Sequence, residues 1–154
     1  SDAPRHEEGG CGIQAGNYAS HLRHDFNVLV DLRARNLLAH RQRGLTEEDA
    51  KAAGHEVKVG KFPMMANSRA KTNREPDGFV KVIAERESDR IIGMHIIGPD
   101  ASTLLAECTL AVNRRVTLDE FSRTIHAHPT LAEAVWEAVA DVDGRSIHKL
   151  ELGL

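Results

Sequence analysis

The residues best suited to chemistry lie in the stretch 126–133, which reads His-Ala-His-Pro-Thr-Leu-Ala-Glu. His128 precedes Pro129, whose ring restricts the backbone, and Glu133 follows at the expected start of a helix. An imidazole titrates near neutral pH, and a neighbouring carboxylate can hold it in one tautomer and stabilise its protonated form. The spacing therefore favours a general acid/base pair formed by His128 and Glu133.

Two other interpretations of this stretch remain open. Thr130 and Glu133 have the spacing of a capping box, and a glutamate in that position is by itself more often a helix cap than a catalyst. His126 and His128 could place two imidazoles on one side of an extended segment as metal ligands. No third ligand has suitable spacing, so no metal site is predicted, and we expect His126 to be packed or hydrogen-bonded in support of the site.

Composition and charge narrow the classes of function. A chain of 154 residues with a formal net charge of −3 gives no reason to expect attraction to nucleic acid or to an anionic membrane. No apolar run approaches membrane-spanning length, and no signal peptide is visible. Cys11 and Cys108 are far apart and form no Cys-x-x-Cys or Cys-x4-Cys pair, which predicts a reducing compartment and no redox dithiol in this chain.

The chain divides into two regions of different composition. Residues 1–44 hold six Arg, four His and no Lys, whereas all six Lys lie between Lys51 and Lys149. We expect residues 1–43 to be a loop or marginal helix that is non-native or disordered, ahead of a domain at 44–150, and a shifted reading frame is one origin of such a segment. Residues 10–15 match G-x-G-x-x-A but lack the apolar strand that this phosphate-binding fingerprint requires.

From Gly44 onward the sequence predicts regular elements. A helix should begin after the N-cap Thr46 and end at Gly54. Further signals predict strands at 57–62, 79–84 and 91–98, a hairpin loop at 87–89, a helix with an apolar stripe at 102–115 that includes Cys108 as a core residue, and helices after the capping boxes at 117–120 and 130–133. This order predicts an α+β fold, an antiparallel sheet with helices packed on one face.

Six blocks occur in the order and spacing of a known family: residues 44–48, 59–63, 66–70, 77–83, 89–99 and 126–133. They resemble the C-terminal interface, or dimerisation, domain of dihydrolipoamide dehydrogenase, a member of the pyridine nucleotide-disulfide oxidoreductases. The block that ends in His-Pro-Thr-Leu-Ala-Glu is its most diagnostic part. The resemblance covers about two-thirds of the chain, and it favours the lipoamide branch through 68–73 and 127–133.

The resemblance implies a composite site in a homodimer. One subunit would supply FAD and a redox cysteine pair, and the interface domain of the other would supply His128 as the base and Glu133 as the group that orients it. It also implies a cis bond before Pro129 and a backbone carbonyl of His128 close to the partner's flavin. NAD and the lipoyl domains of 2-oxoacid dehydrogenase complexes would complete the reaction, in a bacterial cytoplasm or a mitochondrial matrix.

The chain departs from the family in length, because a full member has roughly three domains. The sequence is therefore expected to be a fragment that binds neither FAD nor NAD stably and is inactive alone. Two alternatives stay open: a module that only dimerises, and the interface domain of a related reductase that acts on glutathione, trypanothione or mercuric ion.

Overall fold

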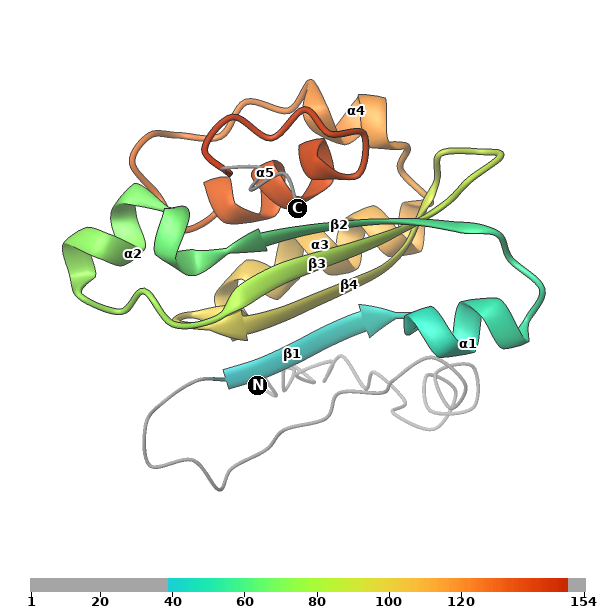
Figure 1. The fold of residues 1–154 in the computed structure, drawn as a ribbon, viewed down its shortest axis with the longest axis horizontal. Coiled ribbons are helices and arrows are strands. Elements are labelled where there is room, and N and C mark those ends of the chain that lie inside the picture. The colour runs from blue at the N-terminus through green and yellow to red at the C-terminus, as the bar shows by residue number, and fades with distance from the viewer. Residues whose placement is uncertain (1–38, 150–154) are drawn as a thin grey trace, which may run out of the picture.

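The computed structural model describes residues 39–149. Its elements are β1 (Ala39–Gly44), α1 (Glu47–Ala52), β2 (Val57–Pro63), the 3-10 helix η1 (Met64–Ala66), α2 (Ser68–Asn73), β3 (Phe79–Glu85), β4 (Ile91–Gly98), α3 (Ala101–Arg114), α4 (Leu118–Ser122) and α5 (Glu133–Asp141). The four strands form one antiparallel sheet in the order β1-β4-β3-β2 (Figure 1).

One face of the sheet carries the core. Strand alternation places the side chains of Phe62, Val80 and Ile96 in one row across β2, β3 and β4. All three are buried, and they pack with the apolar stripes of α3 and α5. Helix α3 lies against β1 and β4, while α5 lies against β2 and β3, so the two longest helices cover the sheet side by side.

The approach of α5 to β2 depends on a glycine. A Cβ atom on Gly60 would lie 2.2 Å from the carbonyl oxygen of Ala138 and 2.6 Å from the backbone nitrogen of Val142. Only a residue without a side chain allows this contact between backbones. Gly60 therefore determines how closely α5 can approach β2. The position of Glu133, the first residue of α5, depends on this distance.

The opposite face is more polar and only partly covered. Lys61, Lys81 and His95 form one row on it. Lys81 makes an ion pair of 2.6 Å with Glu47 of α1, and the Nε2 of His95 lies 3.0 Å from the carbonyl oxygen of Leu45. The predicted α+β class, with helices on one face, is confirmed for α3 and α5, and the segment that includes α1 contacts the second face.

The expected loop or marginal helix is wrong for residues 39–44. They form strand β1, which pairs with β4 from Ala39 opposite Gly98 to Gly44 opposite Gly93. Arg41 and Arg43 conceal the strand because they break the usual pattern of apolar residues, and its partner is distant in sequence. The rest of the predicted lead, including Cys11 and residues 10–15, lies outside the described residues.

Candidate functional site

The stretch that carries His128 is an irregular segment between two helices. Helix α4 ends at Ser122 and α5 begins at Glu133. The His128–Pro129 bond is cis, as expected. The side-chain amide of Asn67 donates to the carbonyl oxygen of Thr130 at 3.0 Å, and the hydroxyl of Thr130 donates to that of Ala127 at 2.8 Å. The segment thus has defined points of attachment on both sides of His128.

His128 and Glu133 are in direct contact. The Nδ1 of His128 lies 2.8 Å from the Oε1 of Glu133. The second carboxylate oxygen, Oε2, accepts the backbone N–H of Thr130 at 2.7 Å. The side chain of His128 is 64% exposed and that of Glu133 is 21% exposed. Within residues 39–149, the Nε2 of His128 has no hydrogen-bond partner, so this nitrogen is available to another molecule.

The predicted capping box at Thr130 and Glu133 is half formed, because the carboxylate of Glu133 accepts the backbone N–H of Thr130 but the hydroxyl of Thr130 does not cap the helix. Helix α5 begins at Glu133 itself, its N-cap is Ala132, and no side chain caps it. The hydroxyl of Thr130 binds Ala127 instead of the helix, because the chain turns at the proline before the helix begins. The carboxylate of Glu133 lies in the first turn, where the helix dipole favours negative charge.

His126 belongs to a separate pair. Its Nε2 lies 3.0 Å from the Oε2 of Glu107 on α3, and its side chain is only 8% exposed. The hydrogen bond that His126 donates to Glu107 raises the pKa of His126 more than burial lowers it. His126 and His128 therefore bind different carboxylates, and the described part of the chain has no group of three or more His, Cys, Asp or Glu arranged as metal ligands.

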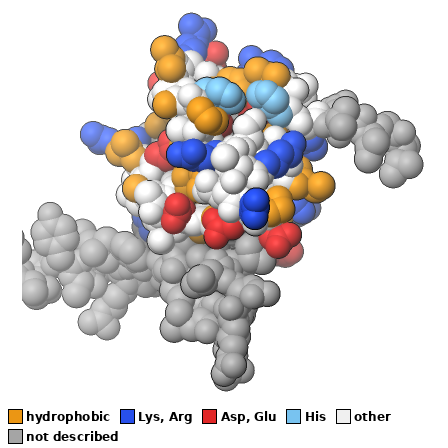
Figure 2. All heavy atoms as spheres, turned by 90° about the vertical axis from the view of Figure 1, so that its left-hand side faces the viewer, with side chains coloured by type: hydrophobic (Ala, Val, Ile, Leu, Met, Phe, Trp, Pro, Cys, Tyr) orange, Lys and Arg blue, Asp and Glu red, His pale blue; other side chains and the backbone are white. Residues whose placement is uncertain are grey.

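A cavity of about 280 Å³ lies beside these pairs. Its lining includes His126, Glu133, Trp136, Glu137 and His148. Figure 2 shows the end of the molecule on which α2 lies in Figure 1, where histidine side chains reach the surface next to hydrophobic ones.

Another histidine–glutamate pair, His148 and Glu137, lines one side of the cavity. Glu137 is buried and binds the imidazole of His148, the hydroxyl of Ser146 at 2.6 Å and the backbone N–H of Ile147 at 2.8 Å. Burial raises the pKa of Glu137, but these hydrogen bonds prevail and leave it below its usual value. The pair attaches residues 146–148 to α5.

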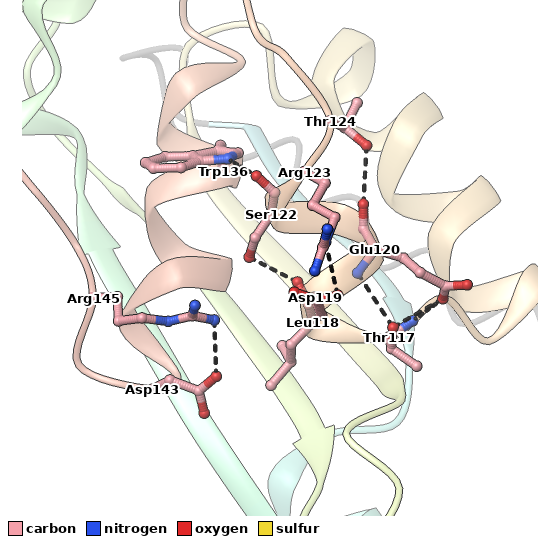
Figure 3. A network of polar contacts seen from close by, with 10 residues as sticks. All are labelled: Thr117, Leu118, Asp119, Glu120, Ser122, Arg123, Thr124, Trp136, Asp143 and Arg145. Atoms are coloured by element: carbon pink, nitrogen blue, oxygen red, sulfur yellow. Dashed lines mark hydrogen bonds and ion pairs between the residues drawn. The ribbon is translucent and has the colours of Figure 1, made fainter.

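Helices α4 and α5 are joined next to the site. The indole N–H of Trp136 donates to the carbonyl oxygen of Ser122 at 2.9 Å (Figure 3). The other end of α4 has the predicted capping box, in which the hydroxyl of Thr117 accepts the backbone N–H of Glu120. The side chain of Trp136 therefore makes a contact within the domain.

Sequence reasoning missed Glu107 and the Glu137–His148 pair. Glu107 lies within the predicted helix at 102–115 that carries an apolar stripe. Its acidic side chain interrupts the run of apolar residues around it. Glu137 interrupts the apolar face of α5 in the same way. A carboxylate inside an apolar helical stripe needs a partner, but the sequence alone does not tell which residue it meets.

Comparison with known families decides the family of the domain. Residues 42–139 match the model of the pyridine nucleotide-disulphide oxidoreductase dimerisation domain. The chain belongs to this family. A dihydrolipoyl dehydrogenase of Bacillus subtilis is 50% identical over 105 residues, which are 68% of this chain and 22% of that protein. A mitochondrial dihydrolipoyl dehydrogenase of Dictyostelium discoideum is 47% identical over 105 residues, with the same coverage.

Solved structures of this kind share the fold. LpdA from Mycobacterium tuberculosis superposes with a TM-score of 0.63 and 27% identity over 66% of this chain and 22% of that one. The flavoprotein disulfide reductase RclA from Escherichia coli also gives 0.63, with 20% identity over 66% of this chain and 23% of that one. The chain spans about a fifth of the length of the dihydrolipoyl dehydrogenases and solved reductase structures that it matches. Within residues 39–149, no helix is both long and apolar enough to cross a bilayer.

Proposed function

We propose that this domain supplies the acid/base half of a dihydrolipoamide dehydrogenase site, with His128 as the base and Glu133 as its orienting carboxylate. The observation that carries the proposal is the 2.8 Å contact between His128 Nδ1 and Glu133 Oε1, together with the exposure of the imidazole. A carboxylate can only accept, so Nδ1 carries the proton and the lone pair is on Nε2.

The proton transfer follows from this tautomer. A free thiol has a pKa of about 8.5 and is mostly protonated at neutral pH. The Nε2 lone pair of His128 takes the proton of a dihydrolipoamide thiol, and the S–H electron pair stays on sulfur as the nucleophilic thiolate. Glu133 accepts the Nδ1–H throughout and stabilises the imidazolium that forms. In the reverse direction, His128 returns the proton.

The flavin and nicotinamide would be held by other parts of the protein or by a partner subunit. A cavity of about 280 Å³ is at the lower end for a small-molecule site and is too small for a dinucleotide. By the family resemblance, the backbone of His128 and Pro129 would lie near the flavin of the partner subunit. FAD bound by the partner would supply the redox chemistry between a disulfide and NAD.

Subunit exchange tests the proposal. The chain is mixed with a full-length dihydrolipoyl dehydrogenase whose matching histidine is replaced by glutamine. We expect activity with dihydrolipoamide to return in the heterodimer, because that subunit supplies the flavin and cysteines and this chain supplies the base. His128→Gln in this chain should lower the activity recovered in the heterodimer by about 10²–10⁴-fold. Lys71→Gln, an exposed change on α2, is the matched control.

Two outcomes would contradict the proposal. One is a heterodimer, demonstrated by sedimentation, that has no activity; this would favour a module that only dimerises. The other is equal recovery with His128→Gln. The chain alone, supplied with FAD, should not turn over dihydrolipoamide. Assays of the heterodimer with glutathione, trypanothione and mercuric ion separate the lipoamide branch from other reductases.

A further inference from the structure

The two histidines of the site segment have opposite hydrogen-bonding environments. The Nε2 of His126 faces a carboxylate oxygen of Glu107 at 3.0 Å, and its Nδ1 faces the carbonyl oxygen of Thr124 at 3.1 Å. Both are acceptors that cannot donate, so both ring nitrogens of His126 must carry hydrogen. His128 has an acceptor on Nδ1 only. The geometry therefore favours the imidazolium form of His126, whereas His128 donates from Nδ1 only.

His126 is held from several directions. Besides its two hydrogen bonds, its ring stacks on Phe121 of α4, with centroids 5.7 Å apart. Glu107 comes from α3, a helix far away in sequence from the site segment. Since His128 is only two residues further along the chain, within about 7 Å of backbone, fixing His126 on α3 and α4 restricts where the imidazole of His128 can lie.

We propose that Glu107 is a positioning residue: through His126 it fixes the segment that carries His128, and it keeps a positive charge beside the His128–Glu133 pair. The inference rests on the proposed function of that pair. Glu107 touches neither a substrate nor the reacting nitrogen, so its effect passes entirely through His126.

The charges around His126 support this role. The Oε1 of Glu107 is buried and has no hydrogen-bond partner within the described residues, so His126 is the group that compensates this carboxylate. Glu133 also contributes to the raised pKa of His126, after Glu107 and Thr124. Arg123, Glu137 and His148 line the same cavity. The imidazolium of His126 thus offsets the negative charge of the acid that orients His128.

The test is 15N NMR of the histidine rings in the 154-residue chain. At pH 7, His126 should have both ring nitrogens protonated, and the Nδ1 of His128 should carry a proton. In Glu107→Gln, the pKa of His126 should fall, as expected for the loss of an opposite charge in contact. His128 should then show a mixture of tautomers, and the amides of 124–130 should exchange with solvent at least tenfold faster.

Controls separate positioning from general stability. Leu104→Ala removes a buried core side chain from the same helix and should destabilise the domain without changing the His128 tautomer. Glu107→Asp should keep His126 charged and restore much of the His128 tautomer. If Glu107→Gln does not fold, the wild-type chain suffices, since raising the pH through the titration of His126 should shift the His128 tautomer at the same midpoint.

Distinct results would overturn each proposal. A neutral His126 at pH 7, or a Glu107→Gln chain whose His128 tautomer and amide exchange match the wild type, would remove the role of Glu107. Glu133→Gln tests the underlying pair: if the His128 tautomer does not respond to this change, the proposed function fails whatever Glu107 does.

Discussion

At the scale of single residues, the surroundings of a side chain decide its chemistry more than its type does. His126 and His128 are separated by one alanine, yet one is 8% and the other 64% exposed. The first faces two acceptors and the second faces one. The same contrast applies to carboxylates, because Glu133 contacts an exposed imidazole whereas Glu137 attaches residues 146–148 to α5.

Cys108 gives a prediction at this scale. Its side chain is fully buried, as expected for a core residue, and burial raises the pKa of its thiol far above the usual range. We expect no reaction of Cys108 with a thiol reagent in the folded chain, because the thiolate is the reactive form. Labelling of a Cys11→Ser variant before and after unfolding in urea measures this.

The unfolded sample is the control, since it should release one reactive thiol. Rapid labelling under native conditions would show that α3 opens or that Cys108 is not in the core.

At the scale of elements, features set by residues close in sequence could be predicted better than contacts between residues far apart in sequence. The N-cap at Thr46 and the capping box at Thr117 are present as expected, because each depends on residues a few positions apart. Strand β1 was missed because its pairing with β4 joins residues 49 to 59 positions apart. The spacing of His128 and Glu133 suggested their contact, but the partner of His126 depends on how α3 packs.

The contact between α5 and β2 yields a prediction about an element. Gly60→Ala should lower the free energy of unfolding by about 1–3 kcal/mol or more, because the added Cβ would collide with the backbone of α5. Urea denaturation measures the loss, and the His128–Glu133 contact should be disturbed because α5 carries Glu133.

Gly54→Ala is the matched control. Its Cβ would meet nothing within 4 Å, but the residue has a φ of +84°. We expect a cost of about 1–2 kcal/mol from backbone strain alone, with no change at His128. An equal effect of both variants on His128 would contradict the steric explanation.

At the scale of the whole molecule, the buried pairs should make stability depend on pH. The folded-state pKa of His126 is raised above 6.5, so its contribution is complete below that pH and is lost as the pH rises through the folded value. The pKa of Glu137 is lowered below 4.5, so its contribution is present above that pH and is lost as the pH falls through the folded value.

Thermal unfolding of variants across a range of pH tests both signs. The stability difference between wild type and Glu107→Gln should shrink as the pH rises above about 6.5. The difference for Glu137→Gln should shrink as the pH falls below about 4.5. Glu48→Gln, on the exposed side of α1, should show no such trend, and a trend of opposite sign for either buried pair would refute its assignment.

The pairing of β1 with β4 has a practical consequence for dissecting this protein. The family match begins at residue 42, but β1 begins at Ala39, so a cut placed at the apparent homology boundary would remove half of an edge strand. The exposed N–H and C=O groups of β4 would then offer a template for pairing with other chains. Recombinant versions that start before Ala39 should therefore stay dispersed at concentrations where shorter ones precipitate.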